Sequence, residues 1–310
     1  MIMLPKNVVA SGIKMFSKHA RDYQLPFASV VIPTLNRKHF LNNCLKSLFA
    51  MDYPKSRFEI IVVDNGCKDG TKEMVKKDFS KVKFIVEKRR GVVHARNTGS
   101  KSAQGLIIAY TDDDCTVDRD WLRNLVSGFT SGEIGAVGGP VFLPDELLFK
   151  KFQTFRYQSF NLGDRKHFVK ALITGNLAVR REVFKKIKFD EALIFHDSED
   201  IDFCRSLTDA GYLLLYMPNA KVYHNVNFNR LSIQNLIKRA FFGGTSIYLV
   251  EKKHAKGILI PRFFRKFLGG ILDFFRGRRI TNFYWLVECF MAFLSSLFFI
   301  TLRRKRDNTS

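Results

Sequence analysis

The sequence predicts an α/β protein whose central sheet is mostly parallel. Apolar runs without polar alternation occur at residues 29–32, 58–63 and 107–110, a pattern typical of strands buried on both faces. Segments with apolar residues at helical spacing separate these runs, for example between Phe40 and Leu48. Such alternation favours a parallel α/β sheet, and 310 residues suffice for one main domain plus an appendage.

The other elements are predicted from their ends as well as from their apolar period. Pro33 is expected to end the first strand, and Thr71 to cap a helix beginning near Lys72. Gly211 is expected to end the helix that starts at Ser198. Further helices are expected after Gly91, at Trp121 and at Ser198 as N-cap, with further strands at residues 82–86, 134–140, 173–181 and 212–217.

Three adjacent carboxylates, Asp112, Asp113 and Asp114, follow the strand at residues 107–110. Like charges at adjacent positions repel, and each is costly to desolvate without a positive partner. Asp64 also follows a strand, and parallel α/β sheets bind ligands beyond the carboxyl ends of their strands. These positions favour a site for Mg²⁺ or Mn²⁺, which prefer hard oxygen ligands, over a plain acidic turn.

The charge balance points to an acidic partner. Lys and Arg outnumber Asp and Glu 51 to 29, a formal net charge of +22. Nucleic acid, an anionic membrane surface and phosphate-bearing substrates all suit this excess. The chain has no recognisable nucleic-acid-binding motif, and its 31 Phe residues gather with Arg and Lys towards the C-terminus, which favours a membrane surface.

The cysteines and the N-terminus bear on the compartment. The five cysteines lie far apart without a CxxC pair, which suits reduced thiols in a cytosolic compartment and disfavours a zinc site. Residues 1–26 form a weakly patterned basic arm, with one short helix expected within residues 8–19. This arm lacks a long apolar core and a small-residue cleavage site, so a secretory signal peptide is not expected.

The motifs together resemble the GT-A nucleotide-sugar glycosyltransferases and, among them, family 2. The resemblance extends over residues 28–225 and rests on VVIPTLN, VVDNGCKDGT, ARNTGS, YTDDDC, TGNLAVRREVF, FDE and SEDIDF, in the order of the family. It implies a Rossmann-like GT-A fold and transfer of a sugar from a nucleoside diphosphate to an acceptor with inversion. A divalent metal would neutralise the diphosphate that leaves, and a carboxylate would deprotonate the acceptor hydroxyl.

The resemblance also implies roles for individual residues. Asp200 matches the catalytic base, with Glu199 as the alternative. His224 falls where some relatives supply a further metal ligand, beside Asp112 and Asp114. Competing interpretations stay open: Asp200 as a charged helix start, His224 as a surface histidine, and Arg96 as the partner of an acid. The residues implied in nucleotide-sugar binding are Pro33, Thr34, Asn36, Asp64, Arg96, Asp112 and Asp113.

Two features depart from the family. Cys67 stands where the family usually has Ser, which is expected to cost a hydrogen bond. The QxxRW motif of processive polysaccharide synthases is absent after the base region, which favours an enzyme that adds a single sugar.

The C-terminal part, residues 229–310, is expected to be a helical, basic and Phe-rich membrane-attachment region that follows a catalytic domain at residues 27–228. Residues 258–275 have the pattern of an amphipathic helix lying in the membrane plane. Residues 283–302 carry a single charge and are long enough to span a bilayer, but basic residues flank both ends. In-plane or re-entrant attachment at the cytoplasmic face is therefore favoured over a single span, and a helical pair packed on the catalytic domain is disfavoured.

The predicted function is that of a metal-dependent, inverting glycosyltransferase that acts on a lipid-linked glycan acceptor. UDP is the favoured nucleotide of the donor, with GDP and dTDP open, and the aromatic residues within 149–160 would face the acceptor. An anionic membrane is expected as a partner and nucleic acid is not. The alternatives are an inactive GT-A scaffold at the membrane and a sugar nucleotidyltransferase, which would need a Gly-rich loop where the chain has IPTLN.

Overall fold

The computed structural model describes residues 25–143, 160–193, 198–225 and 248–254, together with the single helical positions 246, 290 and 294. The expected helix within residues 8–19, the aromatic stretch up to residue 159 and the tail segment 258–275 lie outside these residues, as does most of 283–302. Among the described residues, no helix has the length and apolar character needed to cross a bilayer.

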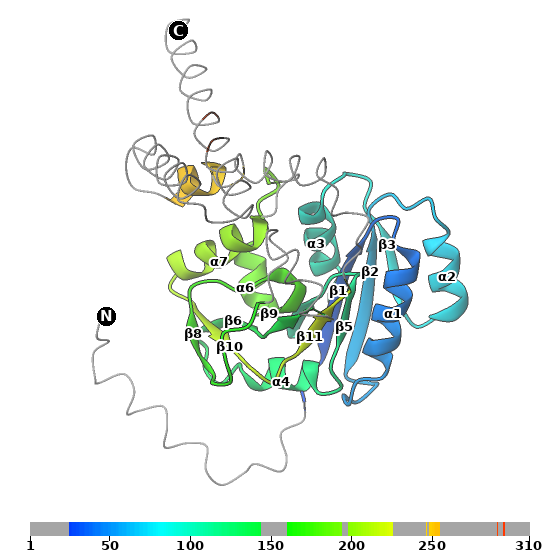
Figure 1. Ribbon diagram of the computed structural model, residues 1–310, viewed down its shortest axis with the longest axis horizontal. Coiled ribbons are helices and arrows are strands. Elements are labelled where there is room, and N and C mark those ends of the chain that lie inside the picture. Colours follow the sequence, from blue (N-terminus) through cyan, green and yellow to red (C-terminus); the bar gives the residue numbers. More distant parts are fainter. Residues whose placement is uncertain are drawn as a thin grey trace, which may run out of the picture.

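An eight-stranded sheet forms the centre of the molecule, in the order β3-β2-β1-β4-β9-β6-β10-β8 (Figure 1). The first four strands of this order are parallel, and β6 and β10 are parallel to each other. The predicted, mostly parallel α/β sheet is thereby confirmed. Its strands are β1 Ala28–Thr34, β2 Phe58–Asp64, β3 Lys83–Val86, β4 Ile107–Tyr110, β6 Ile134–Gly138, β8 His167–Val169, β9 Leu177–Arg180 and β10 Leu213–Tyr216.

The strand expected at residues 173–181 departs from the parallel pattern. It is shorter, begins after a 3-10 turn at Thr174–Asn176, and pairs antiparallel to both β4 and β6 as β9. The preceding strand β8 is also antiparallel, to β10, and β10 is parallel to β6. The strands β8 and β9 therefore run in the same direction, opposite to the other strands of the large sheet.

A second, three-stranded sheet lies beside the site end of β4. It has the order β5-β11-β7 and consists of β5 Cys115–Val117, β7 Val141–Phe142 and β11 Val222–His224. The antiparallel register of β11 and β5 places His224 opposite Cys115, one residue after the acidic triplet. The sequence pattern did not predict that residues 222–224 form a strand.

Five helices begin at or near the positions that the sequence predicted, with differences in capping, and α6 was not predicted. They are α1 Lys38–Phe49, α2 Thr71–Asp78, α3 Val92–Lys101, α4 Trp121–Ser127, α6 Arg181–Lys186 and α7 Glu199–Asp209. Thr71 is not a cap but the first residue of α2, because Asp69 Oδ1 accepts hydrogen bonds from its N–H and hydroxyl. Ser198 occupies the N-cap position of α7 without a capping hydrogen bond, and Gly211 follows α7 with a φ of 88°.

Two hydrophobic clusters cover the two faces of the large sheet. Val30 and Ile32 point into the cluster that contains residues of α1 and α4, and Val31 points into the cluster with residues of α3, α6 and α7. Every residue of β1 is buried, as the unbroken apolar run predicted. The helices thus shield both faces, and the carboxyl ends of the strands are left to form the site.

Asn176, the last residue of the turn before β9, is hydrogen-bonded to three other parts of the chain. It is fully buried; its Oδ1 accepts from Trp121 Nε1 at 2.8 Å, and its Nδ2 donates to the carbonyl oxygens of Pro140 (2.8 Å) and Ala220 (2.7 Å). These bonds tie α4 and the loops beside β7 and β11 to the turn before β9.

We expect Asn176→Ala to lower the free energy of unfolding by about 3 kcal/mol, because Trp121 Nε1 and the Ala220 carbonyl lose their hydrogen-bond partner and the Pro140 carbonyl keeps only the N–H of Val222. Urea denaturation measures this loss. Asn124→Ala is the matched control, since it removes a single exposed hydrogen bond to the carbonyl of Asn219. Equal stability of the two variants would contradict the bridging role of Asn176.

Candidate active site

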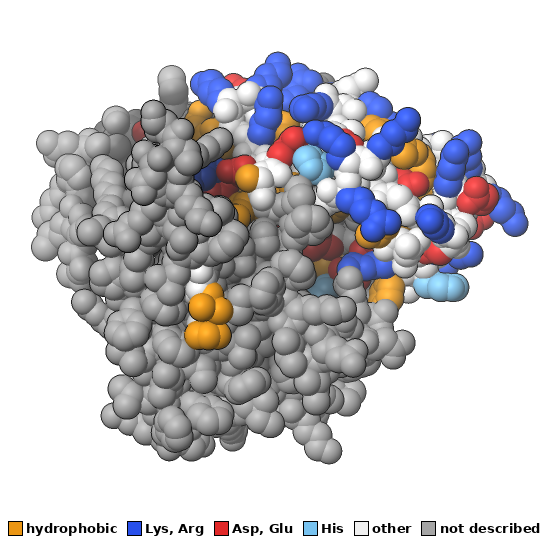
Figure 2. All heavy atoms as spheres, turned by 90° about the horizontal axis from the view of Figure 1, so that it is seen from above, with side chains coloured by type: hydrophobic (Ala, Val, Ile, Leu, Met, Phe, Trp, Pro, Cys, Tyr) orange, Lys and Arg blue, Asp and Glu red, His pale blue; other side chains and the backbone are white. Residues whose placement is uncertain are grey.

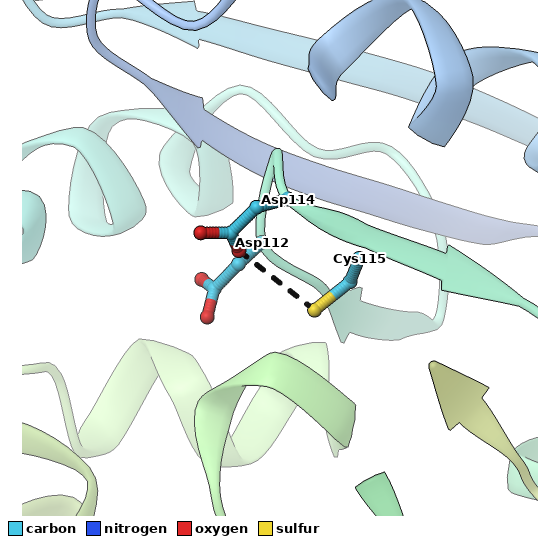
Figure 3. A group of neighbouring side chains, drawn as sticks. All are labelled: Asp112, Asp114 and Cys115. Carbon is cyan, nitrogen blue, oxygen red and sulfur yellow. Dashed lines mark hydrogen bonds between the residues drawn. The ribbon is translucent and has the colours of Figure 1, made fainter. Parts of the chain in front are cut away.

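The acidic triplet between β4 and β5 is held by a different set of partners at each residue. Asp112 contacts Arg96 of α3, Asp113 contacts the loop after β1, and Asp114 contacts both that loop and β11. Distributing the three charges among separate basic side chains relieves the repulsion expected between adjacent carboxylates. Figure 3 shows the carboxylates of Asp112 and Asp114 on the same side of the turn.

Arg37, just after β1, joins two members of the triplet. Its Nη1 lies 2.7 Å from Asp113 Oδ1 and 2.6 Å from Asp114 Oδ2. Burial alone would lower the pKa of Arg37, but Asp113 and Asp114 outweigh it and raise that pKa. The sequence does not single out Arg37, because its partners Asp113 and Asp114 are 76 and 77 residues away in the chain.

Asp113 and Thr34, both predicted to bind the nucleotide sugar, contact each other. The Thr34 hydroxyl donates to Asp113 Oδ2 at 2.8 Å, and both residues are buried. Burial raises the pKa of Asp113 to about 6, although Arg37 opposes the shift. In this arrangement the hydrogen bond fastens the end of β1 to the triplet, and a contact of either residue with the nucleotide stays a prediction.

Arg96 connects the triplet to the first turn of α7. Its guanidinium is buried, with Nη2 2.8 Å from Asp112 Oδ1 and Nη1 2.7 Å from Glu199 Oε1. Burial acts to lower its pKa, but the two carboxylates raise it, so Arg96 is always charged. The interpretation of Arg96 as the partner of an acid is confirmed, and contact with a diphosphate stays a prediction.

The two candidate bases differ in their surroundings. Glu199 is buried against Arg96, whereas the following residue, Asp200, is partly exposed. Asp200 Oδ1 accepts from the N–H of Ile201 at 2.7 Å, as a carboxylate at a helix start does. Asp200 is therefore the more accessible carboxylate of the pair.

The donor atoms beside the triplet fit a hard divalent metal. One ligand atom from each of Asp112, Asp114 and Cys115 lies within 4.8 Å of the others (Figure 3). Burial raises the pKa of the Cys115 thiol well above its usual range, so the thiol stays protonated and the two carboxylates are the suitable ligands. His224 Nε2 lies 3.3 Å from Asp114 Oδ1, beside this group.

The loop after β1 and the loop after β2 are hydrogen-bonded to each other. Asp64 Oδ1 accepts from the N–H groups of Gly66 (2.9 Å) and Cys67 (2.7 Å), and Asn36 Oδ1 accepts from the N–H of Lys68 (2.7 Å). Cys67 Sγ accepts from the Asn36 N–H at 3.2 Å. Cysteine, which stands here in place of the usual Ser, therefore still makes a hydrogen bond.

Pro33 and Asp64 lie at the ends of neighbouring strands, as predicted. Pro33 pairs with Val63, and Thr34 pairs with Asp64, in the parallel register of β1 and β2. Figure 2 looks onto this end of the molecule and shows many Lys and Arg side chains at the surface. The described part of the face drawn in Figure 2 carries many Lys and Arg side chains, a charge that suits a phosphate-bearing ligand.

Known proteins similar to this chain agree on its family. The family described as glycosyl transferase family 2 matches residues 29–188. The chain is 35% identical over 202 residues to the glycosyltransferase AglE of Haloferax volcanii, a match covering 62% of the chain and 64% of that relative. It is 24% identical over 250 residues to a dolichyl N-acetyl-alpha-D-glucosaminyl phosphate 3-beta-D-2,3-diacetamido-2,3-dideoxy-beta-D-glucuronosyltransferase of Methanococcus voltae, covering 75% of the chain and 76% of that relative.

Two solved structures have a similar fold. The mannosyltransferase PcManGT of Pyrobaculum calidifontis, in complex with GDP-Man and Mn²⁺, aligns with a TM-score of 0.58 at 19% identity, over 89% of this chain and 74% of that one. GalNAc-T7 with UDP, GalNAc and Mn²⁺ aligns with a TM-score of 0.57 at 20% identity, over 71% and 48%. At these identities the likeness shows the fold, which is the predicted GT-A fold.

We expect Arg37→Met to lower the free energy of unfolding by about 2 kcal/mol in a metal-free buffer, because Asp113 and Asp114 lose a charged hydrogen-bond donor. Added Mn²⁺ should raise the melting temperature of this variant more than that of the unmutated protein, since the metal supplies the missing positive charge. Thermal unfolding with and without Mn²⁺ measures both effects.

Arg123→Met is the control for Arg37→Met, since Arg123 is an exposed arginine 3.8 Å from Asp52. An Arg37→Met protein that melts like this control at every Mn²⁺ concentration would show that Arg37 does not stabilise the triplet.

Proposed function

The chain belongs to glycosyl transferase family 2, and we propose that it transfers a sugar from a nucleoside-diphosphate sugar to an acceptor hydroxyl, with inversion at the anomeric carbon. The observation that carries this proposal is the link Asp112–Arg96–Glu199, which joins the carboxylates at the end of β4 to the start of α7. A donor bound at the triplet would then lie next to the candidate bases. UDP is the favoured nucleotide, and GDP and dTDP remain alternatives.

Asp112 and Asp114 would hold a divalent metal, Mg²⁺ or Mn²⁺, with His224 as a further candidate ligand. Their oxygens lie close together on one side of the turn, and both similar structures named above were determined with Mn²⁺. When bound, such a metal neutralises the charge that develops on the departing diphosphate. Pro33, Asn36 and Asp64 lie at the adjacent strand ends and would contact the nucleoside.

Asp200 is the proposed general base. Glu199 accepts a charged hydrogen bond from Arg96 and is buried, whereas Asp200 is partly exposed at the same helix end. In a single displacement, the acceptor oxygen bonds to the anomeric carbon while the bond from that carbon to the diphosphate oxygen breaks. The acceptor proton passes to the Asp200 carboxylate, a contribution of about 10²–10⁴ in rate.

The proposed acceptor is a lipid-linked glycan at the cytoplasmic face of a membrane. The Methanococcus voltae relative supports this class, since its name describes a transferase that acts on a dolichyl-phosphate-linked sugar. The composition of residues 229–310, rich in Phe, Lys and Arg, supports attachment to an anionic membrane as a peripheral, re-entrant or single-span protein. Attachment would raise the local concentration of such an acceptor near the site.

The proposal is tested by thermal stabilisation with UDP, GDP and dTDP, each with and without Mn²⁺. We expect one nucleotide to stabilise the protein in a Mn²⁺-dependent way, and Asp114→Asn to lose that stabilisation while the metal-free protein stays folded. Asp112→Asn should weaken the effect less severely. Nucleotide binding that neither EDTA nor these substitutions change would contradict the metal assignment.

We expect Asp200→Asn to keep its affinity for the donor but to lose at least about 10²-fold in kcat, because the base acts on the acceptor. Nucleotide release from the donor in the presence of a lipid-linked acceptor measures this loss. Glu199→Gln is the matched comparison on the same helix turn. If Glu199→Gln abolishes kcat while Asp200→Asn turns over near normally, the two roles are exchanged.

A further inference from the structure

A second cluster of charges lies on α7, separate from the triplet. Its centre is Asp202, which is fully buried one turn after Glu199. Lys253 Nζ lies 2.8 Å from Asp202 Oδ2, and His254 Nε2 lies 2.8 Å from Asp202 Oδ1. Both oxygens of a buried carboxylate are thus bonded to residues that follow about fifty positions later in the chain.

Neighbouring contacts fasten the same helical segment, residues 248–254, along α7. His254 Nδ1 lies 2.7 Å from Asp209 Oδ2 near the end of α7, and Arg205 Nη2 lies 2.7 Å from Glu251 Oε1. These ion pairs run from the second turn of α7 to its last turn. Residues 248–254 therefore pack along the helix that starts with Glu199 and Asp200.

Lys253 also contacts the loop at residues 189–193, which lies between α7 and α3. Its Nζ lies 2.9 Å from Asp190 Oδ2, in the loop at residues 189–193. Asn97 of α3 holds this loop through hydrogen bonds to both the N–H and the carbonyl of Phe189. The Phe189 ring stacks on Phe203 of α7 with 4.3 Å between centroids. A single ammonium group thus bridges the loop and the helix.

The first turn of α7 is consequently fixed from two sides. Arg96 binds Glu199 at the helix start, and Lys253 with His254 binds Asp202 one turn later. Because an α-helix is stiff over two turns, a shift at Asp202 displaces the carboxylate of Asp200 as well. Misplacing a catalytic group by about 1 Å can cost about 10²-fold in rate.

We propose that Lys253, together with His254, is a positioning residue that fixes where α7, and with it the Asp200 carboxylate, lies relative to the donor site. This inference rests on the proposed function of Asp200. The part of the chain needed for catalysis then extends at least to residue 254. This lies beyond the family match, which ends at residue 188, and beyond the domain boundary expected at residue 228. Lys253 and His254 lie within residues 229–310, the region predicted to attach to the membrane, so these contacts join that region to the helix that carries Asp200.

The test compares three variants of the full chain: Lys253→Met, Lys253→Arg and Lys186→Met. Arginine at position 253 keeps the charge and can reach both carboxylates, and Lys186 is an exposed lysine of α6. We expect Lys253→Met to lower kcat by about tenfold or more with the donor KM within about twofold, because the donor site is left intact. Lys253→Arg should restore most of kcat, and Lys186→Met should match the unmutated protein.

Amide hydrogen exchange supplies a second readout that needs no turnover. In Lys253→Met, exchange in α7 should accelerate by about tenfold while exchange in α4 stays unchanged. Equal exchange in α7 of Lys253→Met and Lys186→Met, or a kcat of Lys253→Met within about twofold of the unmutated enzyme, would overturn the proposal. So would a donor KM that rises in step with the loss of kcat.

These outcomes separate this inference from the proposed function. An unmutated protein that transfers no sugar from any tested donor would defeat the proposed function, and the exchange data would still decide whether Lys253 fixes α7. An active protein that tolerates Lys253→Met would defeat only the positioning role.

Discussion

The arrangement of the site depends on one buried cation, the guanidinium of Arg96 between Asp112 and Glu199. Burying a charge is costly unless its partners are ionised and well placed, and here two carboxylates lie within hydrogen-bond distance. Without Arg96, the buried Glu199 and the partly exposed Asp112 would both lose this charged partner. The two ion pairs of Arg96 therefore couple the end of β4 to the start of α7, elements that are far apart in the sequence.

The same logic explains how the fold accommodates three adjacent aspartates. Asp112, Asp113 and Asp114 direct their carboxylates towards different elements, where Arg96, Arg37 and His224 meet them. The basic side chains come from α3, the loop after β1 and β11. Two of the carboxylates nevertheless stay within reach of a common point, which is what a metal ion requires. The carboxylates that pair with these basic side chains thus include the two that lie close enough to bind one metal ion.

The parts of the structure that the sequence predicted are those that local pattern determines. Strands β1 and β2 read as unbroken apolar runs because both of their faces are buried, and the triplet stands out because three like charges are adjacent. The direction of β9 was not predictable from its own residues, since an apolar run does not encode whether its neighbours are parallel. It is seen only in the pairing of β9 with β4 and β6, strands that come from elsewhere in the chain.

The contacts that the sequence did not predict join residues distant in the chain. Arg37 reads as an ordinary basic residue at a helix start, yet its partner Asp113 is 76 positions away. Lys253 reads as one of several lysines, yet it meets Asp202 from 51 positions away. The Arg37 pair depends on the loop after β1 lying beside the triplet, and the Lys253 pair depends on the packing of α7 against residues 248–254. A single sequence carries no signal for either arrangement.

The claim that the Asp112–Asp114 turn is a metal-dependent donor site next to α7 is tested most directly by anomalous diffraction at the manganese edge. Crystals would be grown with Mn²⁺ and the nucleoside diphosphate that binds. The account predicts an anomalous peak within about 2.5 Å of a carboxylate oxygen of Asp114, in contact with the diphosphate, while Arg96 still pairs with Glu199. A bound nucleotide with no manganese at the triplet, or manganese bound elsewhere on the protein, would contradict it.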